Sequence, residues 1–550
     1  GQTWTVISPD LTTNNPEKQK QSESGGLTLD ATGAENHCTI LVIEPSPLEK
    51  DMLWAASDDG RVHYTKDGGI TWNDVSKNLK GLPSGSWITQ IKASQKNKGE
   101  ALLVANDYRR FNYIPYAYRT KNYGKTWERI VDEKDAENYA LCIIEDHLNP
   151  NLMFLGTDDG LYISLNAGKK WEKFDSEIFP TVPVKDLAIQ TREHDLVIGT
   201  FGRAAWVLDD IRPLRALASN PALTNEVSMH LFEPPVAYLA AIQQATGSRF
   251  GADAIYQGTN RKYGAMLSYY LNPPVKKKVD PKTKSEKSDL DKKSIKVNKK
   301  DSITLKVYDG DRLIRTLKKK IPMKKGIHRW YWNMDEKGVS RPSRTPSKSK
   351  REPGGVKVKP GSYRLVMNFA GQQSEQNIIV ETDPRLNVDK QNIDEVYNTS
   401  KELESYMGTA TNAVKQLAES KQVLVDYQKL FKSNKSDEMK SLVKEMKSQT
   451  KAIDSLISLF IGKVDKRQGI VRNPESNVMT RIGGAAGYIR SRQQGMTMTE
   501  ETLMKHAKNE LETAVLKTNT FFNDVWPDLR SKIESENSSQ FKEIEKIKLK

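Results

Sequence analysis

Short apolar segments, with alternating or continuous hydrophobic positions, fill the first 230 residues. Turn residues separate them, which is typical of β-strands. The expected strands read TILVIEP, MLWAASD, VHYTKD, ALLVAND, YAYRTK, LMFLGTD, LYISLN, DLVIGTF and WVLDD. Asp-Asp-Gly stands between two such strands at residues 58–60 and again at 158–160, where the glycine can adopt the positive φ of a hairpin turn.

A longer phrase recurs beside these strands. Residues 65–72, 120–127 and 164–171 read TKDGGITW, TKNYGKTW and SLNAGKKW. The chain opens with GQTWTVIS, in which Gly1 and Trp4 fit the second half of the phrase. A unit of about four short strands that repeats in this way predicts the blades of a β-propeller.

The residues of the phrase have an expected mechanical role. The Asp or Asn can accept hydrogen bonds from its own turn, the Gly permits the bend, and the Trp packs the hairpin into the blade. The three sets are Asp67, Gly69 and Trp72; Asn122, Gly124 and Trp127; and Asn166, Gly168 and Trp171. We predict that these nine residues stabilise turns and perform no reaction.

The hydrophobic pattern changes twice further along. Residues 301–385 alternate with period two between Gly and Pro turns, which predicts a small antiparallel β-sandwich. From residue 386 onward apolar residues recur at helical spacing, which predicts a helical bundle or hairpin. The expected fold class is therefore mainly β with an α tail. Its domains are a propeller at 1–232, a connection with a Lys-rich loop at 233–300, the sandwich at 301–385 and the helical domain at 386–550.

The net charge of +15 raises the question of nucleic acid. Residues 276–300 hold eleven Lys and four acids, and residues 341–352 hold five basic residues and one acid, so two stretches supply most of the excess. Neither stretch contains the interleaved aromatic residues that stack on bases. We expect no nucleic-acid partner, and a polyanion binder that uses these loops is a remote alternative.

Composition excludes several other classes. No apolar run approaches the 20 or so residues of a transmembrane helix. The two cysteines, Cys38 and Cys142, allow one disulfide or none. No pair among the seven His has metal-ligand spacing, and no phosphate-binding glycine motif is present. No cofactor is expected, and calcium binding by the acidic turns lacks a full loop of ligands.

The recurring phrase resembles the Asp-box, or BNR repeat, of sialidases, sortilin-type (VPS10-like) receptors and two-propeller xyloglucanases. The stretches 106–127 and 194–217 resemble exported bacterial proteins often labelled BNR-repeat glycosyl hydrolase. In that family an immunoglobulin-like domain follows the propeller and ends in a DPR phrase. Here KPGSYRLVM precedes Asp383, Pro384 and Arg385, and a helical tail comes next.

The resemblance implies several properties. Residues 301–385 are expected to be immunoglobulin-like, and the chain is expected to be the C-terminal half of a larger protein with more blades. Export to the periplasm, the outer-membrane surface or the medium is expected. The implied partners are other cell-envelope proteins and the N-terminal propeller half.

One stretch, NDYRRFNYIPY, suggests a binding surface. Aromatic residues mixed with arginine can stack on sugars or bind peptides. The candidate residues for binding a glycan or a peptide are Asp107, Tyr108, Arg109, Arg110, Tyr113 and Tyr116. The alternative is a loop that packs against a neighbouring domain.

A catalytic function is the alternative to a binding function. A glycoside hydrolase needs two carboxyl groups that face each other across the sugar. The candidate carboxyl groups are those of Asp107, Asp146, Asp158, Asp159, Asp209 and Asp210, most of which are expected to form turns or ion pairs. We predict a non-catalytic binding or scaffold module of an exported cell-envelope protein. The alternative is a glycoside hydrolase with a cleft between two propellers.

Overall fold

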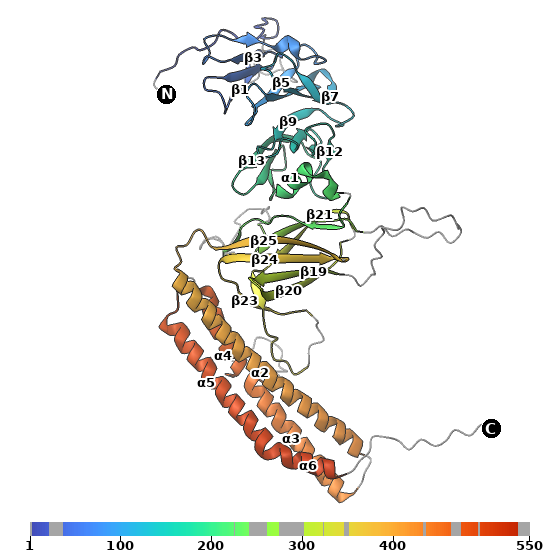
Figure 1. The fold of residues 1–550 in the computed structure, drawn as a ribbon, viewed down its shortest axis with the longest axis vertical. Coiled ribbons are helices and arrows are strands. Elements are labelled where there is room, and N and C mark those ends of the chain that lie inside the picture. The colour runs from blue at the N-terminus through green and yellow to red at the C-terminus, as the bar shows by residue number, and fades with distance from the viewer. Residues whose placement is uncertain are drawn as a thin grey trace, which may run out of the picture. The chain divides into compact units, whose positions relative to one another are not determined.

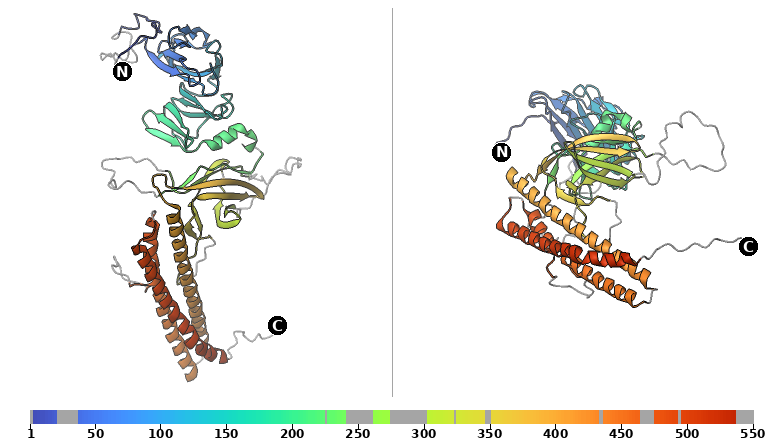
Figure 2. Two further views of the ribbon diagram at one scale, coloured as in Figure 1. Left: turned by 60° about the vertical axis from the view of Figure 1, so that its left-hand side comes forward. Right: turned by 60° about the horizontal axis from the view of Figure 1, so that its bottom comes forward.

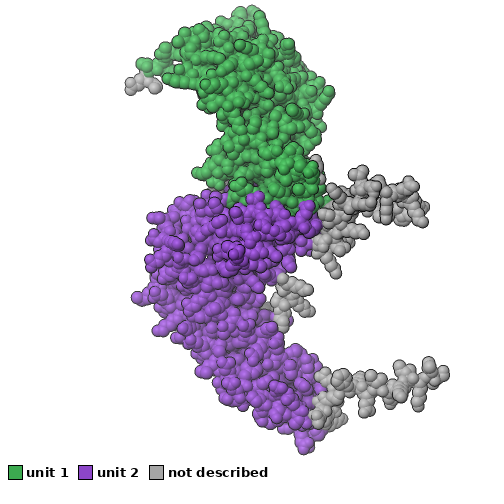
Figure 3. Space-filling view, viewed as in Figure 1, with its two compact units in different colours: residues 1–235, 268–281, 322–328 green, residues 236–267, 282–321, 329–550 purple. Residues whose placement is uncertain are grey.

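The computed structural model describes residues 3–20, 37–224, 226–240, 261–273, 302–322, 324–345, 351–432, 436–463, 475–492 and 495–536. The chain forms two compact units (Figure 3). The first comprises residues 1–235, 268–281 and 322–328, and the second comprises residues 236–267, 282–321 and 329–550. The Lys-rich stretch 276–300 lies outside the described residues.

Four successive antiparallel sheets build most of the first unit (Figure 1). In each sheet the strands pair in chain order, as in the blade of a propeller. The first sheet holds β1 (Ile40–Pro45), β2 (Leu53–Ser57), β3 (Val62–Thr65) and β4 (Asn73–Asp74); the second holds β5 (Trp87–Ala93), β6 (Ala101–Asp107), β7 (Asn112–Thr120) and β8 (Glu128–Val131). The third holds β9 (Ala140–Glu145), β10 (Met153–Thr157), β11 (Gly160–Ser164) and β12 (Glu172–Lys173); the fourth holds β13 (Val184–Gln190), β14 (Asp195–Thr200) and β15 (Ala205–Leu208).

Apolar cores join each of these sheets to the next. The core between the first two sheets contains Trp54, Ile88 and Trp127. The next core contains Val104 and Trp171, and the third is formed by residues of the third and fourth sheets, with residues of α1 (Arg212–Ser219) also packed into it. Because a half-buried sheet must cover its apolar face, this serial packing explains why the strand pattern repeats along the sequence.

The first unit continues beyond the fourth sheet. A short 3-10 helix (Pro221–Thr224) precedes β16 (Met229–Leu231). β16 pairs antiparallel with Tyr269, Tyr270 and Leu271 of β18 (Ala265–Leu271), and β21 spans Gly326–Trp332.

A five-stranded sheet in the second unit has the order β17-β25-β24-β19-β20. β19 (Ser302–Asp309), β20 (Arg312–Lys320), β24 (Gly361–Phe369) and β25 (Gln372–Thr382) pair antiparallel, as the alternating pattern predicts. β17 (Ala237–Leu239) adds to β25 in parallel, which the sequence did not predict. β22 (Asp335–Lys337) and β23 (Gly354–Lys357) form a separate pair. The immunoglobulin-like classification stays a prediction.

Helices form the rest of the second unit. They are α2 (Lys390–Phe431), α3 (Asp437–Ile461), α4 (Val478–Ser491), α5 (Met498–Thr520) and α6 (Trp526–Ser535), with a π-helical turn at Phe521–Val525. α2, α3 and α5 run side by side and share one apolar core with α4 and α6 (Figures 1 and 2). Pro527 lies in the first turn of α6, where a proline is tolerated because its missing N–H would have no partner within the helix.

None of the helices in the described ranges combines the length and the apolar character needed to cross a membrane.

Candidate functional site

The three repeated turns share one hydrogen-bond pattern. The backbone N–H groups of Gly69, Gly124 and Gly168 donate to the hydroxyl of the residue four positions earlier, at 2.9–3.0 Å. The side-chain oxygen of Asp67, Asn122 or Asn166 accepts a hydrogen bond of 2.9 Å from the N–H four positions later. All three glycines have positive φ. These groups are occupied within their own turns, so the turns offer structural support.

The tryptophans of the turns differ in burial. Trp127 and Trp171 are buried in the cores between sheets. The indole of Trp171 donates a hydrogen bond of 2.9 Å to the carbonyl oxygen of Ile130 in the preceding sheet. The indole of Trp72 makes the same kind of bond, 3.0 Å long, to Ile7. Trp4 is 94% exposed.

A layered cluster of aromatic rings and arginine lies at the β6–β7 turn. The guanidinium carbon of Arg109 lies 3.2 Å from the centroid of the Trp87 ring and 4.5 Å from that of Tyr108. Tyr108 stacks on Tyr139 with 4.7 Å between ring centroids. Tyr113 lies against the same ring, at 6.2 Å. We call these five residues the β6–β7 cluster.

A hydrogen bond fixes one ring of the cluster, and exposed apolar side chains lie beside it. The hydroxyl of Tyr139 donates to Asp158 at 2.7 Å, and burial together with this bond raises the pKa of Tyr139. Beside the cluster, Phe111 is 83% exposed and Tyr113 is 51% exposed. Ile114, at 37%, continues the exposed apolar surface.

The six predicted binding residues fall into two groups. Asp107 and Tyr116 are buried, and the amide of Asn112 donates to both. Arg110 donates to Asp107 at 2.5 Å. Asp107, Arg110 and Tyr116 therefore brace the turn, whereas Tyr108, Arg109 and Tyr113 belong to the cluster. Sequence analysis did not identify Trp87 and Tyr139. Trp87 begins β5 and Tyr139 directly precedes β9, and neither strand was predicted.

The candidate carboxyl groups of Asp146, Asp158, Asp159 and Asp210 all bind other side chains of the first unit. Asp146 is fully buried and binds Arg215 through two hydrogen bonds, of 2.7 and 2.6 Å. Asp159 pairs with Lys173 at 2.6 Å. Asp210 accepts from Arg212 at 2.6 Å, the arrangement expected for a capped strand end. Asp158 accepts a hydrogen bond from the hydroxyl of Tyr139.

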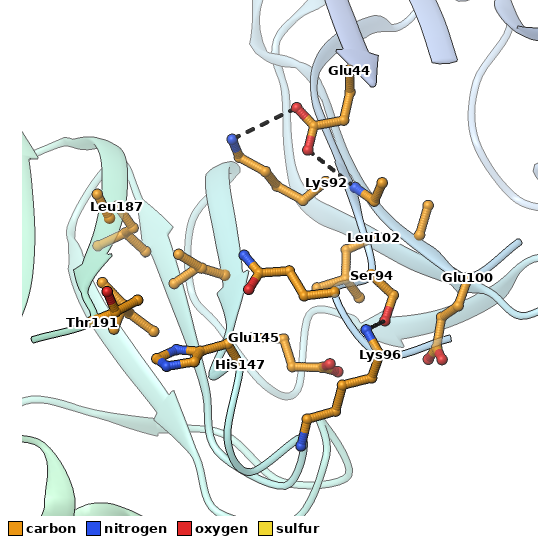
Figure 4. A pocket seen from close by; sticks show the side chains of 16 residues that line it. Glu44, Lys92, Ser94, Lys96, Glu100, Leu102, Glu145, His147, Leu187 and Thr191 are labelled. Atoms are coloured by element: carbon orange, nitrogen blue, oxygen red, sulfur yellow. Dashed lines mark hydrogen bonds and ion pairs between the residues drawn. The ribbon is translucent and has the colours of Figure 1, made fainter. Parts of the chain in front are cut away.

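A small cavity lies at the opposite ends of the inner strands from the β6–β7 turn (Figure 4). Its volume is about 230 Å³. Figure 4 shows Glu44, Lys92, Glu100, Glu145 and His147 around it. Burial raises the pKa of Glu44 and of Glu145.

Basic groups accompany these glutamates. Arg119 lies 2.5 Å from Glu145 and 3.5 Å from Glu100, so one guanidinium bridges two carboxylates. Lys92 lies 3.9 Å from Glu44. The cavity is smaller than the roughly 300 Å³ at which pockets for drug-sized ligands begin.

Metal and thiol chemistry find little support among the residues that the structure describes. No group of three or more His, Cys, Asp or Glu in those ranges is arranged to hold a metal ion. Cys38 and Cys142 are both free thiols. Burial raises the pKa of the Cys142 thiol, which disfavours a reactive thiolate.

The four blade-like sheets and the helical C-terminal region define a protein of the β-propeller type with an α-helical tail. Residues 116–210 match the Sortilin-Vps10 family model, described as sortilin, neurotensin receptor 3. The match confirms the resemblance to sortilin-type propeller proteins over this segment. No curated protein sequence matches the chain.

Solved structures with similar folds include enzymes and other propellers. The xyloglucanase of Xanthomonas campestris is 14% identical, with a TM-score of 0.24, over 31% of this chain and 29% of that chain. YCF48 from Cyanidioschyzon merolae is 18% identical, with a TM-score of 0.21, over 31% of this chain and 56% of that chain. The β-propeller domain of Cps50 (Swd1) from Myceliophteria thermophila is 13% identical, with a TM-score of 0.24, over 32% of this chain and 52% of that chain. The chain thus spans less than two thirds of each of these structures.

Proposed function

We propose that this chain is a non-catalytic binding or scaffold module of an exported cell-envelope protein. Its β6–β7 cluster engages a protein partner, and the helical tail offers a second contact surface within a larger complex. The observation that carries the proposal is the layering of Trp87, Arg109, Tyr108 and Tyr139 beside the exposed Phe111 and Tyr113. Aromatic residues and arginine are the residue types most enriched at the energetic centre of protein interfaces.

Rigidity supports this role. Because the rings are stacked and the hydroxyl of Tyr139 is fixed by Asp158, little side-chain entropy remains to be lost on binding. The φ of Phe111 is +60°, a left-handed conformation that turns the exposed ring outward from the tip of the turn. A strained and exposed aromatic residue at a turn is typical of a binding loop.

The test compares two surface variants. Phe111→Ser combined with Tyr113→Ser removes exposed aromatic surface from the β6–β7 turn and leaves the buried Asp107 and Tyr116 in place. Ile178→Ser removes a residue that is 66% exposed elsewhere on the same unit. The wild-type chain and both variants are immobilised and exposed to a cell-envelope extract, and the bound proteins are identified by mass spectrometry.

Proteins retained by the wild-type chain and by Ile178→Ser should be lost from the double variant. Equal retention by all three proteins would exclude the β6–β7 cluster as the binding surface. Retention of nothing at all would count against the scaffold role.

A glycoside hydrolase is the second candidate, since a carboxyl group with a raised pKa is what a general acid requires. Glu44 and Glu145 have that property. Each, however, has a basic partner within 4 Å in a small cavity. Release of reducing sugar from xyloglucan by the wild-type chain, with loss of that release in Glu145→Gln, would favour the hydrolase.

A further inference from the structure

A groove in the second unit is larger and more apolar than the cavity among the blades. It has a volume of about 770 Å³, within the range of pockets that hold small-molecule ligands. β23 and the short segment after it form one side, and α2 and α4 form the others. None of the functions considered above uses it.

Aliphatic side chains form most of the groove. They come from separate elements and are Val339, Val356, Ile393, Val396, Met407 and Ile489. A ligand that covers these side chains would gain roughly 25 cal/mol for each Å² of apolar surface removed from water. The groove therefore favours a ligand with an extended apolar body.

Five basic residues line the groove: Arg341, Lys357, Lys359, Arg490 and Arg492. Lys359 and Arg492 form ion pairs with Asp394 and Glu500, at 2.9 and 3.1 Å, and Lys357 and Arg490 come from different elements. The ammonium of Lys357, on β23, donates a hydrogen bond of 2.6 Å to the carbonyl of Asn333 and lies 4.7 Å from the centroid of the Tyr263 ring. The guanidinium of Arg490, near the end of α4, donates to the carbonyl of Ala486 in its own helix. Within the described ranges, no carboxylate oxygen lies within 4.0 Å of either cation.

These two cations act on each other. Desolvation lowers the pKa of Lys357, and repulsion by Arg490 lowers it further, against the attraction of Asp335. Asp335 itself lies 3.5 Å from Arg315. A negative charge placed between Lys357 and Arg490 would relieve this repulsion and could accept charge-assisted hydrogen bonds from both.

Acidic groups also line the groove. Asp335, Asp383 and Glu404 all border it. Each of these carboxylates has a basic partner, in Arg315, Arg385 and Lys401, and the groove is lined by more basic than acidic residues, so it favours a compact anionic head group such as a carboxylate.

We infer that this groove binds a single-chain amphiphile with a carboxylate head, of the long-chain fatty acid class. The carboxylate lies between Lys357 and Arg490, and the hydrocarbon chain covers the aliphatic side chains contributed by β23, α2 and α4.

The experiment titrates the full 550-residue chain, freed of bound lipid, with the fluorescent fatty acid cis-parinaric acid. Arg490→Gln removes one head-group contact from an exposed position. Arg481→Gln is the matched control, because it lies on the same helix and does not border the groove. Binding should saturate at one site. Arg490→Gln should weaken it about tenfold to a hundredfold, the loss expected for one charged hydrogen bond, and Arg481→Gln should leave it unchanged.

A blocking variant tests the apolar part separately. Val356→Trp places a large ring in the groove and should abolish binding, with an unchanged circular dichroism spectrum as the check on folding. Hexadecanol, which has the chain without the charge, should compete poorly. The inference is overturned if the chain does not bind the fatty acid, if the two arginine variants behave alike, if hexadecanol competes equally well, or if an apolar peptide binds the groove and the fatty acid does not.

Discussion

The indole nitrogen of Trp171 donates a hydrogen bond to the carbonyl oxygen of Ile130, which belongs to the preceding sheet. Ile130 also lies against the turn glycine of Trp171's own motif, since a Cβ at Gly168 would lie 3.4 Å from that of Ile130. Val75 stands in the same relation to Gly124, and Ile7 to Gly69. In each case the apolar residue follows a tryptophan by three positions. The repeated turns therefore join neighbouring sheets as well as bending the chain.

The two buried tryptophans should differ in their response to phenylalanine. Trp171→Phe removes a hydrogen bond between sheets, whereas the indole nitrogen of Trp127 has no partner among the described residues. We expect Trp171→Phe to destabilise the first unit by about 1 kcal/mol more than Trp127→Phe does. Hydrogen exchange of peptides from β8 and β12, followed by mass spectrometry, measures the difference. Equal effects would show that the bond to Ile130 contributes nothing.

Alanine at the turn glycines should cost stability according to the space available. A Cβ at Gly124 would lie 2.8 Å from Cγ2 of Val75, and φ there is +75°. At Gly202 φ is +87°, but no atom lies within 4 Å of such a Cβ. Gly202→Ala should therefore cost about 1 kcal/mol from backbone strain alone. Gly124→Ala should cost more, by an amount that urea denaturation can resolve. The reverse order would contradict the close packing of Val75 on this turn.

The turn at Asp67 should respond to acid. Hydrogen bonds from Thr71, and then from Thr65, lower the pKa of Asp67 from 3.8 to about 2. Since the folded pKa is depressed, this contribution to stability is complete above about pH 4 and is lost as the pH falls through about 2. Asp67→Asn should remove the acid dependence of this turn and keep the fold, because Asn occupies the equivalent position in the other two turns. Asn122→Asp should introduce a similar dependence. Thermal unfolding between pH 2 and 5 tests both variants, and identical pH profiles for all the proteins would contradict the assignment.

Removing one partner of the ion pair between Asp146 and Arg215 should be costly. Asp146 is fully buried, and Asp146→Asn leaves Arg215 without its doubly hydrogen-bonded carboxylate. We expect a loss of about 3–5 kcal/mol in the free energy of unfolding. Urea denaturation of the purified variant measures it. A stable variant that lost a glycosidase activity of the wild type would instead identify Asp146 as catalytic.

Sequence patterns located β1 and the middle strands of the blades, and missed β5, β9 and β13 together with the last strands β4, β8 and β12. β5 and β13 were not predicted, because their apolar residues alternate with Gln, Lys and Asp. β9 was not predicted either, although it reads ALCIIE. In β5, the amide oxygen of Gln90 accepts a hydrogen bond of 2.7 Å from the backbone of Ile143 in the next sheet. Such long-range partners leave no periodic signal in the sequence.

Within the predicted helical domain, α4 has a weak local signal. Its sequence contains Gly483, Gly484 and Gly487, and each glycine within a helix costs about 1 kcal/mol relative to alanine. A capping box between Asn477 and Thr480 and a buried apolar face offset that cost. Capping and tertiary packing therefore stabilise a helix that local propensity disfavours.

For the β6–β7 cluster, sequence reasoning found the turn but could not separate its buried residues from its exposed ones. It could group Tyr108, Arg109 and Tyr113, which are neighbours in the chain. The burial of Asp107 and Tyr116, and the arrival of Trp87 and Tyr139 from other strands, follow from the antiparallel register of the sheets.

Each turn contacts the apolar residue that lies three positions after the tryptophan of the preceding motif. This contact has an evolutionary consequence. A segment that runs from one tryptophan to the next carries both halves of such a joint, one at each end. Gene duplication of that segment would insert a complete sheet together with compatible joints on either side. The number of sheets can therefore increase or decrease without the evolution of a new interface between sheets.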